Sequence, residues 1–335
     1  MMKKRVAING FGRIGRLTCR QLLHYPDIEV VAVNDLTDIP TLAHLFKYDT
    51  AHRKYQGEVH AGADFIEIDG QKIKALAQKD PLLLPWKDLN IDIVLECTGI
   101  YLTHDTAHQH IQAGAKKVIL SAPPKDSSIP IFVLGVNDTE LNVTSDIISN
   151  ASCTTNCLSP LIKIINDTWG IKMATMNTIH AYTQDQRLQD APHKDLRRAR
   201  AAAMSIIPTS TGAAKAVEQV YPNIKGKLFA SSYRVPVITG SLIELFCVLN
   251  SEVTVQDINN RFQLASTTTH QGLIEYNLDP IVSTDIIGNP HSAVFDAELT
   301  EAQGNYIKIV AWYDNEAGYS NRLANMCSRL ANLLA

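Results

Sequence analysis

The 335-residue sequence has no apolar run that approaches the roughly 18 residues of a transmembrane helix. Its positively charged start, Lys3–Arg5, is followed by only a short apolar run, Val6–Ile8, before Asn9 and Gly10. A secretory signal peptide needs about 7–15 apolar residues at that point. We therefore expect neither a membrane span nor a signal peptide, and we predict a cytoplasmic protein.

The sequence also lacks a strong excess of charge of either sign. Lys and Arg number 31 against 34 Asp and Glu, which gives a formal net charge of −3. This balance gives no general reason to expect nucleic acid or an anionic membrane as the primary partner. The one dense basic run, His193–Arg200, lacks the interleaved aromatic residues of a nucleic-acid stacking surface.

A disulfide framework and a metal-binding pattern are missing as well. The six cysteines lie scattered along a long chain, so we expect free thiols. Cys153 and Cys157 have no further ligands at metal-site spacing. His104, His108 and His110 come without a carboxylate motif, and we interpret them as a solvated helix face. No metal site is predicted.

Without repeats, low-complexity tracts or long linkers, a chain of this length favours two domains. The first half alternates expected strands at residues 5–9, 28–34, 91–96 and 117–121 with expected helices at 13–24 and 104–114. This alternation predicts a doubly wound parallel sheet. The fold class is therefore α/β, with a Rossmann-type nucleotide-binding sheet.

The second half changes character near residue 150. An expected helix at 153–168 precedes longer strand runs at 173–178, 237–249 and 306–313, which indicate an α+β domain with a mixed or antiparallel sheet. Residues 181–208 show neither period and predict a long, ordered functional loop. The last stretch, 316–334, predicts a helix with one apolar face, made of Leu323, Met326, Cys327 and Leu330.

A dinucleotide-binding motif follows the first strand. Gly10, Gly12 and Gly15 form a G-x-G-x-x-G that opens a helix, where glycines allow a tight turn and a close approach to a pyrophosphate. The second strand ends at Asp35, an acidic residue that would accept hydrogen bonds from a ribose diol and repel a 2′-phosphate. We therefore predict NAD rather than NADP; the alternative is a glycine-rich turn with a chance aspartate.

Cys153 is the candidate nucleophile. It lies at the start of a helix capped by Ser or Asn, where the helix dipole favours the thiolate. The hydroxyl residues around it are poor core material but good phosphate ligands. Cys157, one turn later, is interpreted as a packing residue. His180 ends a strand and enters the long loop, so it is the candidate general base, and as an imidazolium it would also stabilise the thiolate.

Two further elements suit anions. Ser210, Thr211 and Gly212 form a hydroxyl-plus-glycine run that leads into a helix. Arg234 is an isolated cation of the type that binds phosphate in a bidentate manner. The second half thus combines a nucleophile, a base and anion-binding groups.

These motifs together resemble the glyceraldehyde-3-phosphate dehydrogenase family over essentially the whole chain. The matching segments are 9–16, 152–157, 193–197, 210–215 and 312–316. The resemblance implies an NAD-binding domain at 1–151, completed by the C-terminal helix 316–335, and a catalytic domain at 152–315. It also implies a homotetramer, in which the long loop reaches toward a neighbouring subunit's cofactor.

The resemblance implies a reaction as well. Cys153 would attack the aldehyde of glyceraldehyde 3-phosphate while His180 takes the proton, and inorganic phosphate would cleave the resulting thioester. The family places the substrate phosphate near Thr183, Arg198 and Arg234, and the attacking phosphate near Ser152, Thr154, Thr211 and Gly212. The cofactor positions that match are Arg13, Ile14, Asp35, Lys79, Thr98, Ser121 and Asn315, the last of which would fix the nicotinamide amide.

Four places depart from the family pattern. Gln184 stands where Asn is usual, Arg53 replaces a turn glycine, Val237–Gly240 replaces Thr-Pro-Asn-Val, and Ala317 replaces Trp or Thr. We expect the change at 237–240 to affect the packing of the core sheet and the strength of the tetramer. The change at Ala317 is expected to loosen the nicotinamide pocket. Neither removes a reacting group.

The closest rival function is that of erythrose-4-phosphate dehydrogenase, which hydrolyses its thioester. Segments 96–101 and 289–294 resemble that branch. Thr183 and the run 210–215 keep the phosphorylating pattern, which we favour because a hydrolase needs no second anion site. A binding protein on a nucleotide-fold scaffold is a third reading, which the combination of Cys153, His180 and Asp35 opposes.

Overall fold

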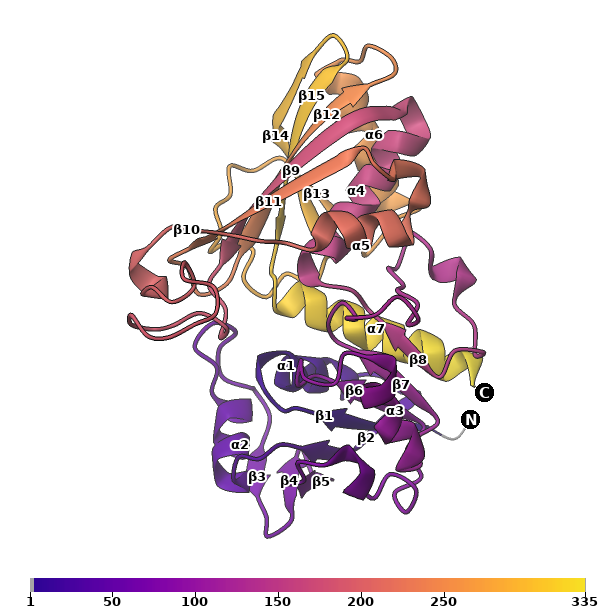
Figure 1. The fold of residues 1–335 in the computed structure, drawn as a ribbon, viewed down its shortest axis with the longest axis vertical. Helices are drawn as coiled ribbons and strands as arrows, with labels where there is room; N and C mark the ends of the chain where they lie inside the picture. The colour runs from indigo at the N-terminus through magenta and orange to yellow at the C-terminus, as the bar shows by residue number, and fades with distance from the viewer. Residues whose placement is uncertain (1–2, 335) are drawn as a thin grey trace. The chain divides into compact units, whose positions relative to one another are not determined.

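The computed structural model describes residues 3–334, and the chain divides into two compact units (Figure 1). The first unit contains the chain up to Phe132, then Glu140–Ala151, and the chain from Ser320 on. The second contains Val133–Thr139 and Ser152–Tyr319. Each unit has its own sheet and its own hydrophobic core.

The first unit is built on an eight-stranded sheet with the order β3-β4-β5-β2-β1-β6-β7-β8. Its strands are β1 (Lys4–Asn9), β2 (Ile28–Asn34), β3 (Val59–Ala61), β4 (Phe65–Ile68), β5 (Gln71–Leu76), β6 (Ile93–Glu96), β7 (Lys117–Leu120) and β8 (Ile147–Ser149). Its helices are α1 (Arg13–Leu22), α2 (Ile39–Lys47) and α3 (His104–Gln112). The six strands β5, β2, β1, β6, β7 and β8, in that order across the sheet, pair in parallel. Strands β3 and β4 extend the sheet beyond β5 by antiparallel pairing.

The strand order places β1 at a topological switch point. The chain moves from β1 outward through β2 to β5, then returns to the other side of β1 as β6. Every residue of β6 and β7 is buried, as expected for central parallel strands covered on both faces. The predicted doubly wound parallel sheet is confirmed, and ligands of such sheets bind beyond the carboxyl ends of the strands at the switch point.

The second unit contains a seven-stranded mixed sheet with the order β10-β11-β9-β12-β15-β14-β13. Its strands are β9 (Ile171–Ala181), β10 (Ile207–Thr209), β11 (Leu228–Val235), β12 (Ser241–Leu249), β13 (Ile274–Asn277), β14 (Ala293–Gln303) and β15 (Tyr306–Tyr313). Its helices are α4 (Cys153–Trp169), α5 (Ala213–Val220) and α6 (Val255–Thr267). Only the β9–β11 and β13–β14 pairs are parallel, so the predicted mixed sheet is confirmed.

The final helix, α7 (Ala317–Leu333), confirms the predicted apolar face. Leu323, Met326, Cys327 and Leu330 are all fully buried. From Ser320 on, the helix belongs to the first unit, where Ser328 Oγ donates to Asp27 at 2.7 Å.

Two predictions about local structure are wrong. The run 237–249 is not one strand, because β12 begins only at Ser241, after Gly240 takes a φ of +87°. A side chain at Gly240 would place its Cβ 2.4 Å from the carbonyl oxygen of Ser283, so the glycine is required there. The strand expected at 91–96 likewise begins later, at Ile93.

His110 does not lie on a solvated helix face. Its side chain is fully buried, with Nε2 3.0 Å from Glu96 Oε2 and with Nδ1 accepting a 3.0 Å hydrogen bond from Trp86 Nε1. Because Trp86 can only donate, Nδ1 carries no proton, and the Nε2 proton goes to the Glu96 carboxylate. The burial of His110 was not predicted because α3 consists mostly of polar residues. His104 is half exposed, as expected.

Arg53 occupies the turn where the family pattern has glycine, and its φ is +65°. A non-glycine residue in this left-handed region carries strain that glycine avoids. We expect Arg53→Gly to raise the free energy of unfolding of the first unit by roughly 1 kcal/mol. Urea unfolding followed by circular dichroism measures the change, and an unchanged or lower midpoint would contradict it.

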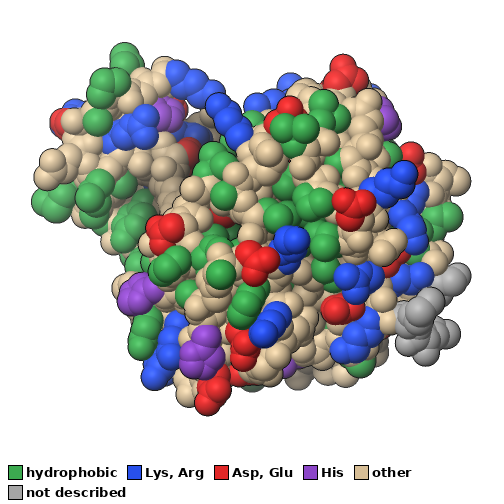
Figure 2. All heavy atoms as spheres, turned by 90° about the horizontal axis from the view of Figure 1, so that it is seen from below, with side chains coloured by type: hydrophobic (Ala, Val, Ile, Leu, Met, Phe, Trp, Pro, Cys, Tyr) green, Lys and Arg blue, Asp and Glu red, His purple; other side chains and the backbone are tan. Residues whose placement is uncertain are grey.

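None of the helices between residues 3 and 334 combines the length and apolar character needed to cross a bilayer. On the face seen in Figure 2, acidic and basic side chains are interspersed, so that face carries no continuous basic patch.

Candidate active site and cofactor site

The glycine loop after β1 is shaped for close packing and close approach. Gly10 has a φ of +92°, and a Cβ there would lie 2.7 Å from Thr98 N. A Cβ on Gly15 would lie 2.1 Å from the carbonyl oxygen of Gly10. Gly12 instead faces open space and begins α1 without a side-chain cap. The helix N-terminus is therefore free of a competing side chain and can receive an anionic group.

Asp35 follows β2 directly and lies beside this loop. Its carboxylate accepts hydrogen bonds from Phe11 N at 2.9 Å and from Thr37 N at 3.0 Å. A carboxylate offers about four lone-pair sites, so acceptor capacity remains for the two hydroxyls of a ribose. The glycine loop and Asp35 thus fit a dinucleotide.

Thr98 and Ser121 follow β6 and β7, at the same edge of the sheet as Gly10 and Asp35. The amide of Thr98 donates to Glu96 Oε1 at 2.7 Å, and Ser121 N donates to Glu96 O at 2.9 Å. The carboxyl ends of four neighbouring parallel strands thereby gather at one edge, where Rossmann sheets bind their ligands.

Three other expected cofactor residues are placed less directly. The guanidinium of Arg13 pairs with Asp49, and Ile14 is half-buried in the first turn of α1. Lys79 is exposed, and its carbonyl accepts a 2.7 Å hydrogen bond from Tyr101.

In the second unit, Cys153 and His180 come together from separate elements. Cys153 is the first residue of α4, whose N-cap Ser152 accepts a hydrogen bond from Thr155 N at 3.1 Å. His180 is near the end of β9, and its Nε2 lies 3.4 Å from Cys153 Sγ. Its Nδ1 lies 2.7 Å from the carbonyl oxygen of Ala181. The Ala181 oxygen can only accept, which favours a proton on Nδ1 and a free lone pair on Nε2. The Arg234 guanidinium beside Nδ1 can only donate, which favours the opposite tautomer.

Burial and a neighbouring positive charge keep the His180 ring uncharged. Burial lowers the pKa of His180 to about 3, and the positive charge of Arg234 acts in the same direction. Arg234 Nη1 lies against His180 Nδ1 and donates to Ala181 O at 3.2 Å. At neutral pH the ring is therefore uncharged. This corrects the expectation of a standing imidazolium that stabilises a thiolate, because a buried cation beside Arg234 is disfavoured.

The Cys153 thiol is subject to opposing effects. Burial raises its pKa, whereas Arg234 and the hydrogen bonds from Thr154 lower it. The N-terminus of α4 also favours the thiolate. Cys157 lies fully buried in the core, and burial raises its pKa well above the usual value, as expected for a packing residue.

The anion-binding residues of the long loop gather around an acidic side chain that sequence reasoning missed. Asp185 accepts hydrogen bonds from Thr183 and Arg198, and Arg198 Nε also donates to Thr209 Oγ1 at 2.7 Å. Arg198, Arg234 and the Thr183 hydroxyl all lower the pKa of Asp185. The predicted ligands of the substrate phosphate are therefore linked through one carboxylate. The Thr-x-Asp spacing just after His180 was the available signal.

These features coincide with matches to known protein families. Residues 152–315 match the model described as "Glyceraldehyde 3-phosphate dehydrogenase, C-terminal domain", and residues 4–104 match "Glyceraldehyde 3-phosphate dehydrogenase, NAD binding domain". The chain belongs to the glyceraldehyde-3-phosphate dehydrogenase family. The fold class, the cofactor NAD and the dehydrogenase class predicted from the sequence are thereby confirmed.

Relatives with the same name cover nearly the whole chain. The glyceraldehyde-3-phosphate dehydrogenase of Mycobacterium avium is 52% identical over 340 residues, which span 99% of this chain and 100% of that relative. Glyceraldehyde-3-phosphate dehydrogenase 2 of Streptomyces avermitilis is 51% identical over 336 residues, with 99% and 100% covered. Glyceraldehyde-3-phosphate dehydrogenase 2 of Bacillus subtilis is 49% identical over 332 residues, with 98% and 97% covered.

Tyr313 is a second residue of the candidate site that sequence reasoning missed. Its hydroxyl lies 3.0 Å from Thr154 Oγ1 and 2.9 Å from Thr178 Oγ1, and its ring meets His180 edge-on. Burial raises the pKa of Tyr313. Thr154, expected at the attacking phosphate, is thus buried and turned toward Tyr313. The antiparallel pairing of β12 with β9 and with β15 places Tyr313 next to Thr154 and His180. No local sequence motif indicates this position.

The other site residues of this family member lie on neighbouring helices and turns. Thr211 Oγ1 accepts a 3.2 Å hydrogen bond from Ala213 N, and Thr211 and Gly212 lead into α5, which packs on α4. Asn315 follows β15 and is 5% exposed. Among residues 3–334, no three His, Cys, Asp or Glu side chains gather as ligands for a metal ion.

Proposed function

We propose that the chain oxidises glyceraldehyde 3-phosphate with NAD and inorganic phosphate, yielding 1,3-bisphosphoglycerate. The observation that carries the proposal is the 3.4 Å contact of Cys153 Sγ with His180 Nε2, at a helix N-terminus and within a chain of this family. The relatives named above are all glyceraldehyde-3-phosphate dehydrogenases, which favours this reaction over the erythrose-4-phosphate alternative.

Cys153 and His180 share the covalent chemistry. The sulfur of Cys153 bonds to the aldehyde carbon while its proton passes to Nε2 of His180, and the protonated ring then stabilises the hemithioacetal oxygen. Bound NAD would accept a hydride from that carbon, leaving a thioester. An oxygen of inorganic phosphate then attacks the carbonyl carbon, the carbon–sulfur bond breaks, and Cys153 is released.

Two anions must bind during this cycle, and the chain offers two groups of donors. Thr183, Arg198 and Arg234 are proposed for the substrate phosphate. Thr183 and Arg198 both bond to Asp185, and the charge of Arg234 acts on the same carboxylate. Ser152, Thr211 and Gly212 are proposed for the attacking phosphate. Thr154 contacts the hydroxyl of Tyr313 and is proposed to support this group. Hydroxyl and backbone donors suit a phosphate that must arrive, react and leave.

The experiment that tests the proposal measures NADH formation from both aldehydes, with and without phosphate or arsenate. We expect turnover of glyceraldehyde 3-phosphate to depend on the added acceptor, because a closed thioester site excludes rapid hydrolysis. Fast turnover without phosphate, together with a higher kcat/KM for erythrose 4-phosphate, would establish the hydrolytic alternative instead.

The choice of NAD over NADP is assigned to Asp35. Two backbone hydrogen bonds hold its carboxylate beside the glycine loop, where it would repel a 2′-phosphate. We expect Asp35→Ala to narrow the preference for NAD by at least about tenfold, which corresponds to one lost charge-assisted interaction. The ratio of kcat/KM for the two cofactors measures this. Equal efficiency of the unaltered protein with both would refute the assignment.

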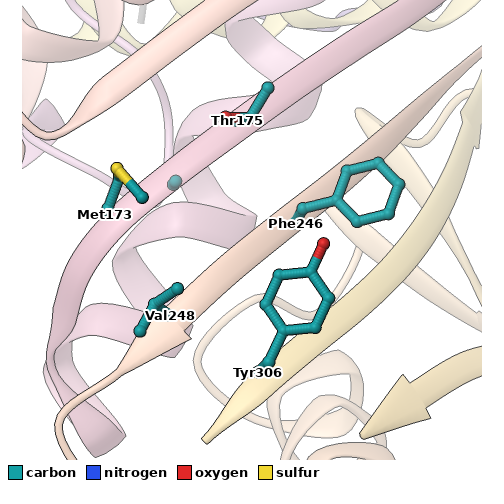
Figure 3. Close-up of a pocket in the computed structure, with 6 residues that line it drawn as sticks. Met173, Thr175, Phe246, Val248 and Tyr306 are labelled. Carbon is teal, nitrogen blue, oxygen red and sulfur yellow. The ribbon is translucent and has the colours of Figure 1, made fainter. Parts of the chain in front are cut away.

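We also propose that the chain forms a homotetramer, with a second copy on the outer face of the mixed sheet. We define this face by Met173, Thr175, Phe246, Val248 and Tyr306, whose side chains line a shallow pocket (Figure 3). Met173 is 51% exposed and Tyr306 48% exposed. Contiguous exposed apolar side chains of this kind mark protein contacts.

Domain roles and location complete the proposal. We assign NAD binding to the first unit, which includes α7 from Ser320 on, and catalysis to the second. The domains predicted from the sequence, 1–151 with 316–335 and 152–315, differ from these units at residues 133–139 and 316–319. The cytoplasmic location remains a prediction from the sequence.

A further inference from the structure

The side-chain amide of Asn315 is held in one orientation by a hydroxyl. Ser241 Oγ accepts a 3.1 Å hydrogen bond from Ala181 N and lies 2.8 Å from Asn315 Oδ1. Because an amide oxygen can only accept, the Ser241 hydroxyl donates its proton to Asn315 Oδ1. Thr239 Oγ1 lies 3.5 Å from the same oxygen. The amide nitrogen of Asn315 has no hydrogen-bond partner among residues 3–334 and is presented as a donor.

Thr239 braces the turn that carries Asn315. Its hydroxyl donates to Asp314 Oδ1 at 2.7 Å, and both side chains are buried, at 2% and 1% exposure. The same carboxylate accepts hydrogen bonds from Glu316 N at 2.9 Å, Ala317 N at 3.0 Å and Gly288 N at 2.8 Å. Asp314 thus ties the start of α7 to two other segments, and Thr239 supplies the side-chain donor.

The segment that provides these hydroxyls is the one that departs from the family pattern. Thr239 stands where Asn is usual, and Gly240 where Val is usual. Gly240 takes its φ of +87° without a Cβ, which would otherwise meet Ser283. The departure therefore forms a consistent turn that sets Thr239 and Ser241 against Asp314 and Asn315.

We propose that Thr239 and Ser241 are positioning residues that fix the Asn315 amide, so that its NH₂ donates to the carboxamide oxygen of the nicotinamide ring. The proposal rests on the proposed function and on the contact with the nicotinamide amide that the family resemblance implies for Asn315. An amide free to rotate by half a turn would present its oxygen to that same oxygen, which is repulsive. Fixing the orientation therefore favours binding of the nicotinamide half of the cofactor and leaves the adenosine half unaffected.

The experiment compares the affinity of the full-length protein for NAD and for ADP-ribose, which lacks nicotinamide, by titration calorimetry. Thr239→Val keeps the shape of the side chain and removes the hydroxyl, whereas Thr239→Ser keeps the hydroxyl. We expect Thr239→Val to weaken NAD binding about threefold to tenfold, the size of one hydrogen bond, with ADP-ribose changed less than twofold. Thr239→Ser should restore the unaltered affinity.

A cycle with Asn315→Ala separates positioning from general damage. If Thr239 acts through Asn315, Thr239→Val should have no further effect on NAD affinity in the Asn315→Ala background. Equal weakening of NAD and ADP-ribose, or additive effects in the cycle, would overturn the proposal. Should Thr239→Val fail to fold, Ser241→Ala takes its place in the same comparison. If the unaltered protein bound neither ligand, the proposed function itself would fail.

Discussion

Replacing Cys153 by serine is expected to lower the rate of aldehyde oxidation by at least about 10³-fold, a loss of the size seen when a covalent nucleophile is removed. The serine hydroxyl would occupy the same place, 3.4 Å from His180 in the present geometry, but it ionises far less readily than a thiol. Steady-state NADH formation with saturating substrate and phosphate measures the loss. Binding of NAD should be retained, because the glycine loop and Asp35 are untouched.

The matched control is Cys157→Ser. Cys157 lies one turn further along α4, is fully buried, and has a thiol pKa raised well above the usual value, so it offers no thiolate at neutral pH. This variant should keep most of the activity. Iodoacetamide should label Cys153 first. Preferential labelling of Cys157, or an active Cys153→Ser variant, would reverse the assignment.

Replacing His180 by asparagine is expected to lower kcat by roughly 10²- to 10⁴-fold, the usual contribution of a general base. His180 has a pKa lowered to about 3 by burial and by Arg234, so it is a neutral proton acceptor throughout the physiological range. Asparagine keeps the size of the site but cannot accept the thiol proton. The Michaelis constant for the aldehyde should change much less than kcat.

The pH dependence of Cys153 alkylation gives a second readout of His180. In the unaltered protein His180 Nε2 lies 3.4 Å from Cys153 Sγ and can share the thiol proton during the reaction, which extends alkylation to lower pH. In His180→Asn the thiol must ionise alone, and burial raises its pKa. The thiolate fraction then grows only as the pH rises, so the alkylation profile should move to higher pH. An unshifted profile would show that His180 does not take the proton.

The parts of the site that could be predicted from the sequence are those marked by short sequence motifs. The glycine loop, Asp35 at the end of a strand, and Cys153 at the start of a helix are each defined by neighbours a few residues away, and each element stands where predicted. The end of β9 at His180 was found in the same way. Such positions depend on backbone geometry that repeats in every protein, which is why residue type and spacing were enough.

Side chains that act through distant partners escaped prediction. Nothing near Asp185 in the sequence indicated that Arg198 and Thr183 would bond to it. Likewise, Tyr313 was one of several aromatic residues in strands, and its contact with Thr154 could not be predicted. The burial of His110 depends on Glu96 and Trp86, which come from other segments. The wrong start of the strand at 237–249 has the same origin, because the space at Gly240 is set by Ser283.

By itself, the sequence determined the α/β class, the mixed second sheet, the dinucleotide motif and the candidates for nucleophile and base, because each follows from periodicity or from chemistry at short spacing. Tertiary structure alone decided which neighbours surround those groups. It placed Arg234 against His180 and so made the histidine a neutral base, where the isolated residues had suggested an imidazolium. The physical reason is that burial and charge at a site are sums over residues far apart in the chain, and only the register of strands and the packing of helices bring those residues together.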